Sequence, residues 1–93
     1  MTDAPTAATF TPHIGKTVSL PGGHKLTLEA VDQRDAQAGM RAPFALLLRG
    51  PAAPVVPEGL HRFVFDGGAS FELYLIPIHT PSRDRQDYQI VFN

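Results

Sequence analysis

A hairpin pattern dominates residues 60–78, which read LHRFVFDGGASFELYLIPI. In both halves large apolar side chains recur at every second position, which is the period of a β-strand with one buried face. Between the halves lies Asp66-Gly67, a pair that tolerates the positive φ angles of a tight turn. We therefore expect two antiparallel strands, over residues 60–65 and 71–78, with a mixed outer face on the second strand.

A second hairpin is expected closer to the N-terminus. A short strand at residues 17–20 is followed by Pro21-Gly22, which suits a type II turn because proline presets a negative φ angle and glycine accepts a positive one. Residues 25–31 then alternate between apolar and polar side chains, as a half-buried strand does. The apolar face of this strand is expected to hold Leu26, Leu28 and Ala30.

Two further strands complete the pattern. Residues 44–48 are apolar on both alternating faces, which indicates a central strand that is covered on two sides and ended by Gly50-Pro51. The prolines between residues 51 and 57 predict an extended connector, because proline cannot donate to a sheet ladder. The last strand, residues 88–92, is expected to pair inside the sheet and not to form a dispensable edge.

These elements predict an all-β fold of about six strands, either a small antiparallel β-sandwich or a partly open barrel. Residues 1–9, rich in Ala, Thr and Pro, predict a flexible N-terminal arm, and residues 10–93 predict a single β-domain without a convincing helix. A polar loop is expected over residues 32–40, with a helical turn over 33–38 as the alternative. A charged, solvated loop is expected over residues 80–87. Its charged side chains are Arg83, Asp84, Arg85 and Asp87.

The composition excludes several classes of protein. Of the 93 residues 43% are hydrophobic and 18% are charged, which indicates a folded domain and not a disordered chain. The net charge of -1 and the scattered Lys and Arg residues argue against a nucleic-acid partner. No cysteine is present for a disulfide or a thiolate metal site. Because no signal-peptide pattern and no apolar run of ~18 residues occurs, we expect no membrane insertion and a protein that is cytoplasmic or exported without a cleaved signal peptide.

The histidines do not predict a metal site. None of them lies at a ligand spacing such as H-x-H or H-x-x-x-H, so solvated or hydrogen-bonded histidines are expected, and no cofactor is expected. His61 shares its alternation with Phe63 and Phe65, which indicates a partly buried packing residue. The four positions are His13, His24, His61 and His79.

A catalytic centre is not expected either. The candidate set for a hydrolase is Ser19, Ser70 and Ser82 with any histidine and with Asp66 or Asp84. The GGAS segment at residues 67–70 lacks the G-x-S-x-G elbow, and a hairpin turn explains it better. The sequence does not place any two of the carboxylates Glu29, Glu58 and Glu72 at a catalytic separation. We therefore expect a protein that is not an enzyme, with a serine hydrolase as a less favoured alternative.

The aromatic side chains indicate an interaction surface. Five aromatic side chains together are more than one small core is expected to hold, although core packing is the alternative for most of them: Phe63, Phe65, Tyr74, Tyr88 and Phe92. We expect a non-enzymatic β-module that binds a protein partner or forms a homo-oligomer. The alternative is a small ligand-binding β-domain with an aromatic-lined pocket. The candidate interface residues are His61, Phe63, Phe65, Tyr74 and Tyr88.

Several segments resemble a family of short bacterial proteins, a domain of unknown function. They are residues 10–15, FALLLRGP at 44–51, Glu58-Gly59 before a strand, LYLIPI at 73–78 and YQIVFN at 88–93. The family pattern has an F-x-L-x-F-x-G-P strand end, a Q-G-x-Y strand start and a Y-x-x-x-F-N finish, and this chain departs from it at Glu58 and His61. The resemblance implies an all-β fold with no assigned activity. Because members are often encoded near phage-tail-collar-like proteins, it also implies a phage-tail-like or surface-fibre assembly by association.

Overall fold

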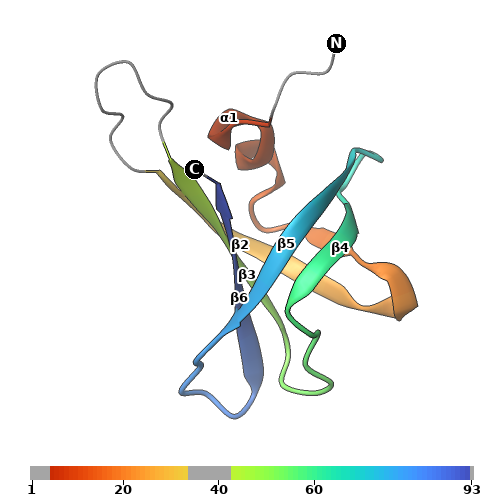
Figure 1. The fold of residues 1–93 in the computed structure, drawn as a ribbon, viewed down its shortest axis with the longest axis vertical. Helices are drawn as coiled ribbons and strands as arrows, with labels where there is room; N and C mark the ends of the chain where they lie inside the picture. The colour runs from red at the N-terminus through yellow and green to blue at the C-terminus, as the bar shows by residue number, and fades with distance from the viewer. Residues whose placement is uncertain (1–4, 34–42, 93) are drawn as a thin grey trace.

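Six antiparallel strands close into a barrel in the computed structural model, which describes residues 5–33 and 43–92 (Figure 1). The strands are β1 (Thr17–Ser19), β2 (Lys25–Gln33), β3 (Phe44–Pro51), β4 (Gly59–Val64), β5 (Ser70–Ile78) and β6 (Arg85–Phe92). Around the barrel their order is β1-β2-β3-β6-β5-β4. The predicted all-β fold of six strands is confirmed, in the barrel form and not as a sandwich.

The expected hairpin over residues 60–78 is present as β4 and β5. The two strands pair in register from Gly59 opposite Leu75 to Val64 opposite Ser70. At the turn the Phe65 N–H donates to the Ala69 carbonyl over 2.7 Å. The two glycines of this turn have φ angles of 88° and 95°, which side chains disfavour, so the glycines are what allow the chain to reverse here.

The N-terminal hairpin also forms, and it closes the barrel. Gly22, in the short 3-10 turn η2 (Pro21–Gly23), has φ 84° and ψ 8°, the values that the predicted type II turn requires at its second central position. β1 pairs with β2 at three positions, but with β4 only where Ser19 lies opposite Val64. The seam between β1 and β4 is therefore the weakest-paired junction of the barrel.

A β-bulge changes the second half of β2. Leu28 lies opposite Leu48, and Ala30 lies opposite Leu47. Glu29 is therefore an extra residue that lies opposite no residue of β3 in the strand register. One extra residue inverts the alternation of a strand. The prediction that Ala30 shares the inner face with Leu28 is therefore wrong. Val31 packs against the core in place of Ala30. β2 also runs on to Gln33, into the expected loop, whose residues 34–40 lie outside the described residues.

β3 and β6 form the centre of the sheet. β3 lies between β2 and β6, and β6 lies between β3 and β5. The last strand is therefore paired on both sides, and the prediction that it pairs inside the sheet is confirmed. The cover on β3 is unequal: its inner side chains are buried, whereas Ala45 and Leu47 on the outer side are half-buried. β3 also continues through Pro51, which lies opposite Arg85. The predicted charged loop is therefore shorter than expected, and Arg85 and Asp87 belong to β6.

One short helix occupies part of the expected N-terminal arm. Helix α1 (Ala7–Phe10) continues into a 3-10 turn, η1 (Thr11–His13). The Thr6 N–H donates to Thr9 Oγ1 over 3.0 Å, and the Thr9 N–H donates to the Thr6 carbonyl over 3.0 Å, a reciprocal cap that holds the first turn. The prediction that the chain has no helix is wrong at α1. Residues 1–4 of the expected arm lie outside the described residues.

Phe10 explains why α1 forms. Its side chain is fully buried, and its ring centre lies 5.3 to 6.1 Å from the rings of Phe44, Phe65, Phe71 and Phe92. Figure 1 shows α1 over the end of the barrel where the chain also terminates. Burying a Phe side chain contributes about 1.5–3 kcal/mol, enough to order a four-residue helix that has little stability of its own.

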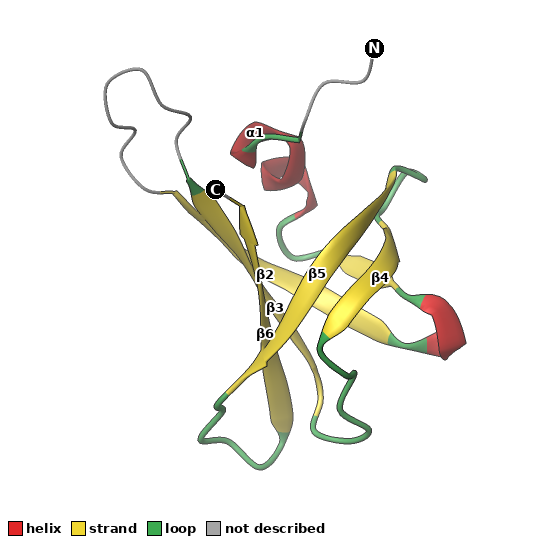
Figure 2. Ribbon diagram, viewed as in Figure 1, coloured by secondary structure: helices red, strands yellow, loops and turns green. Residues whose placement is uncertain are grey.

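The opposite end of the barrel is closed by the connector between β3 and β4. Figure 2 shows this connector as a loop that leaves the base of β3 and returns to β4. Val56 in the connector is buried, and its N–H donates to the hydroxyl of Tyr88 over 2.9 Å. Tyr88 is fully buried on β6, so this hydrogen bond attaches the connector to the core. All buried residues in the described ranges are apolar or aromatic.

Candidate functional site

The predicted interface residues divide between the core and the surface. Phe63, Phe65 and Tyr88 lie inside the barrel and are not available to a partner, because their positions point inward in the strand alternation. His61 is half-buried, and its Nε2 lies 2.8 Å from the Pro57 carbonyl oxygen. Of the five aromatic candidates Tyr74 reaches furthest into solvent, with 48% of its surface exposed. Three of the five candidate interface residues are therefore core residues, which leaves His61 and Tyr74.

Exposed apolar side chains gather on the outer side of β4 and β5. The exposed large hydrophobic side chains of the described residues are Ile14, Val55, Leu60, Val64, Tyr74 and Val91. Three of these six, Leu60, Val64 and Tyr74, lie on the outer side of β4 and β5, and Val55 belongs to the connector before β4. Leu60 is the most exposed of them, at 62%, and it lies directly opposite Tyr74 in the strand register. An apolar cross-strand pair that faces water is unusual unless a partner covers it.

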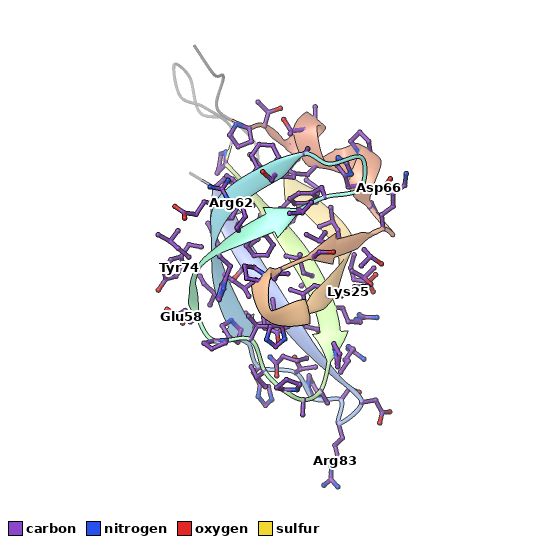
Figure 3. The ribbon with its side chains drawn as sticks, turned by 90° about the vertical axis from the view of Figure 1, so that its right-hand side faces the viewer. Lys25, Glu58, Arg62, Asp66, Tyr74 and Arg83 are labelled. Atoms are coloured by element: carbon purple, nitrogen blue, oxygen red, sulfur yellow. The ribbon has the colours of Figure 1, made fainter. Side chains whose placement is uncertain are left out.

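Charged side chains border this pair. We call Glu58, Leu60, Arg62, Val64, Glu72 and Tyr74 the β4–β5 outer face. The Tyr74 hydroxyl donates to Glu58 Oε2 over 2.7 Å, which places the carboxylate beside the apolar pair. Arg62 lies opposite Glu72 in the register and makes no ion pair with any of the described residues. Figure 3 shows Glu58, Tyr74 and Arg62 along one side of the barrel.

The contact with Glu58 also changes the chemistry of Tyr74. The hydrogen bond to Glu58, followed by desolvation and by the negative charge of Glu58, raises the pKa of Tyr74 above its ordinary value of 10.0. The phenol therefore stays protonated, as a hydrogen-bond donor, throughout the neutral pH range. The β4–β5 outer face thus offers two apolar side chains, a fixed carboxylate and a guanidinium that has no partner in the described chain.

The sequence contained a signal for this surface that the aromatic pattern alone does not show. Leu60, Arg62 and Val64 occupy the positions that alternate with Phe63, so a strand with Phe63 inside must carry these three outside. Counting aromatic residues selected three core residues instead, namely Phe63 on β4, Phe65 just after it and Tyr88 on β6. Tyr74 was identified, but its partner Leu60 was not.

The outer side of β3 and β6 has a different character. Arg49 Nη1 lies 2.8 Å from Glu29 Oε1, and Arg49 Nε lies 3.3 Å from Asp87 Oδ1. The same Asp87 oxygen lies 3.2 Å from Arg85 Nε. These charges therefore pair with one another across β2, β3 and β6. Beside them two shallow hollows of about 380 and 250 Å³ share Asp32, Ala45 and Gln89 in their walls.

A cavity of about 230 Å³ lies at the end of the barrel that the connector closes. Its walls include Leu26, His24, Pro54, Val56 and Tyr88. Tyr88 is the one aromatic residue other than histidine among its described wall residues, and the Tyr88 hydroxyl already accepts the Val56 N–H. This cavity is the nearest match to the ligand pocket that the sequence offered as an alternative, but it is not lined by several aromatic rings, since Tyr88 and His24 supply the aromatic rings among its described wall residues.

The histidines of the described ranges do not gather into a metal site. No group of three or more His, Asp or Glu side chains is placed to hold a metal ion there. The Asp66 carboxylate lies 3.2 Å from Lys16 Nζ, and the Ser82 hydroxyl accepts the Asp84 N–H over 3.1 Å. The Asp66 carboxylate therefore has a lysine as its partner, whereas the contact between Ser82 and Asp84 uses the backbone N–H of Asp84 and not its carboxylate. His13 Nδ1 is buried without a hydrogen-bond partner, next to the ring of Phe65.

Comparison with known proteins places the chain in a family. Within residues 5–33 and 43–92 no helix has the length and apolar character needed to cross a membrane. Neither a curated protein nor a solved structure matches the chain. A family model described as a domain of unknown function (DUF6916) matches residues 5–92, which spans nearly the whole sequence. The chain therefore belongs to the DUF6916 family.

Proposed function

We propose that this domain is a non-enzymatic protein-association module that binds its partner through the β4–β5 outer face. The single observation that carries the proposal is that three of the six exposed large hydrophobic side chains of the described residues, Leu60, Val64 and Tyr74, lie on this face. Isolated exposed apolar residues are common on protein surfaces and need no explanation. A cluster bordered by charged residues is the usual composition of a binding surface, with an apolar centre and a polar rim.

The other surfaces support this choice by contrast. On the outer side of β3 and β6, Arg49 is already paired with Glu29 and Asp87, so those charges have no need of a partner. The cavity beside Tyr88 is small and has its tyrosine hydroxyl engaged. A role in a phage-tail-like or surface-fibre assembly, which the resemblance in sequence implies, is one setting that such a module would serve.

A photo-crosslinking experiment in the native cells tests this proposal. A benzophenone amino acid replaces Leu60 in one variant and Arg83 in a control variant, since both side chains are exposed but Arg83 lies in the turn before β6. We expect a protein adduct of discrete mass from position 60 and none from position 83. Equal adducts at both positions, or none at position 60, would contradict the proposal.

A further inference from the structure

We propose that the partner of the β4–β5 outer face is a second copy of this chain, related by a two-fold axis that passes beside Leu60. This inference rests on the proposed function, because it names the partner of the same surface. The largest group of closed oligomers in soluble proteins is two-fold dimers, in which one surface must be complementary to itself. The β4–β5 outer face meets that requirement in both its apolar and its charged residues.

The apolar centre is self-complementary because its two members lie side by side. Leu60 and Tyr74 are directly opposite each other on neighbouring strands. A two-fold axis that lies in the interface, perpendicular to the strands, places each β4 over the β4 of the other copy with the strands antiparallel. Leu60 then packs on Leu60 and Tyr74 on Tyr74, so the most exposed apolar residue of the described chain is covered.

The charges are complementary about the same axis. Glu58 and Arg62 lie two residues before and two residues after Leu60. The hydrogen bond from Tyr74 fixes the Glu58 carboxylate on the outer face. The two-fold axis exchanges the two ends of the strand, so Arg62 of each copy lies over Glu58 of the other. Two equivalent ion pairs result, and each uses a guanidinium that has no ion pair in the described part of one chain.

This geometry makes a specific prediction about charge reversal. In a dimer of the Glu58→Arg variant two arginines of each copy face two arginines of the other. In a dimer of the Arg62→Glu variant two glutamates of each copy face two glutamates of the other. Each variant alone should self-associate more weakly, with a dimer dissociation constant raised by about 10-fold or more, because like charges that face each other in an interface are strongly unfavourable. An equimolar mixture of the two variants restores both ion pairs and should form a heterodimer.

Sedimentation velocity of the full chain tests the inference. Wild type is measured over a concentration series, followed by each single variant, the double variant Glu58→Arg/Arg62→Glu and the mixture of single variants. Arg83→Glu and Asp84→Arg, two exposed residues in the turn before β6, serve as matched controls. We expect dimers for wild type, for the double variant, for the mixture and for both controls, and monomers of 10.1 kDa for each single variant.

Other outcomes overturn the inference and leave the proposed function separately testable. Single variants that dimerise as well as wild type would show that the copies associate through another surface. A wild type that stays monomeric at the highest concentration would show that the partner is not a second copy. In either case a discrete adduct from a photo-crosslinker at Leu60 would still support the proposed function. The mass of the adduct would show whether the crosslinked partner is a second copy of this chain or another protein. Circular dichroism of each variant distinguishes a lost interface from a lost fold.

Discussion

On the inner side of the β4–β5 hairpin Phe63, Leu73 and Leu75 pack into the barrel core, whereas on the outer side Leu60 and Tyr74 face water in the same register. Both sides are apolar, but they have different consequences. The inner residues stabilise the barrel, and the outer residues contribute less to it because about half or more of each side chain stays exposed. The comparison indicates that apolar side chains on one face of a strand can stabilise the fold while those on the other face are available for binding.

The largest expected effect lies on the inner side. Replacing Phe63 by Ala removes a fully buried ring and should lower the free energy of unfolding by about 3–5 kcal/mol. For a domain of this size that loss corresponds to a fall in melting temperature of more than ~10 °C. Thermal denaturation followed by circular dichroism measures it. Leu60→Ala on the outer side is the matched control, and an equal loss of stability there would break the distinction between the two sides.

A smaller effect is expected where the connector meets the core. Tyr88→Phe keeps the ring but removes the hydroxyl that accepts the Val56 N–H. A buried donor without its acceptor costs about 1–3 kcal/mol, and the expected fall in melting temperature is accordingly smaller than for Phe63→Ala. Denaturant unfolding with a two-state fit measures the difference. Tyr74→Phe, which removes an exposed hydroxyl, is the control, and a larger loss there than at Tyr88 would contradict this account of the connector.

The smallest expected effect concerns the titration of Tyr74. Glu58→Gln removes the carboxylate whose hydrogen bond and charge raise the pKa of Tyr74, so that pKa should fall toward 10.0. Because the pKa of Tyr74 in the folded wild type is raised, its contribution to stability is complete below pH ~10 and is lost as the pH rises through the folded-state value. NMR titration of the Tyr74 ring carbon measures the pKa in both proteins. An unchanged value in the variant would show that Glu58 does not contact Tyr74 in solution.

Much of the barrel follows from local sequence patterns. The β4–β5 hairpin and the turn at Gly22 depend on neighbouring residues, on alternation and on glycine conformation, and both were predicted. The alternation of residues 88–92 likewise predicted a strand there. Two features depend on contacts between distant residues, which alternation does not encode. The bulge at Glu29 appears only when β2 is aligned with β3, and α1 forms only because Phe10 finds four other phenylalanine rings at the barrel end.

The candidate surface was predicted less well than the fold, for a related reason. Aromatic residues are expected both in cores and in interfaces, so their number did not separate Phe63 and Tyr88, which are buried, from Tyr74, which is exposed. Within β4 the alternation does separate the inner Phe63 from the outer Leu60, Arg62 and Val64 once one inner residue is known. The hydrogen bond between Tyr74 and Glu58, which joins β5 to the connector, could not be read from the sequence because the two residues are 16 positions apart.

The central claim is that the β4–β5 outer face binds a second copy and is not needed for folding. Sedimentation velocity of Leu60→Glu against wild type tests it most directly, with Val91→Glu as the control because Val91 is the exposed apolar residue on β6. We predict that wild type and Val91→Glu sediment as dimers and that Leu60→Glu sediments as a folded monomer of 10.1 kDa. A Leu60→Glu protein that sediments as the wild type does would contradict the claim.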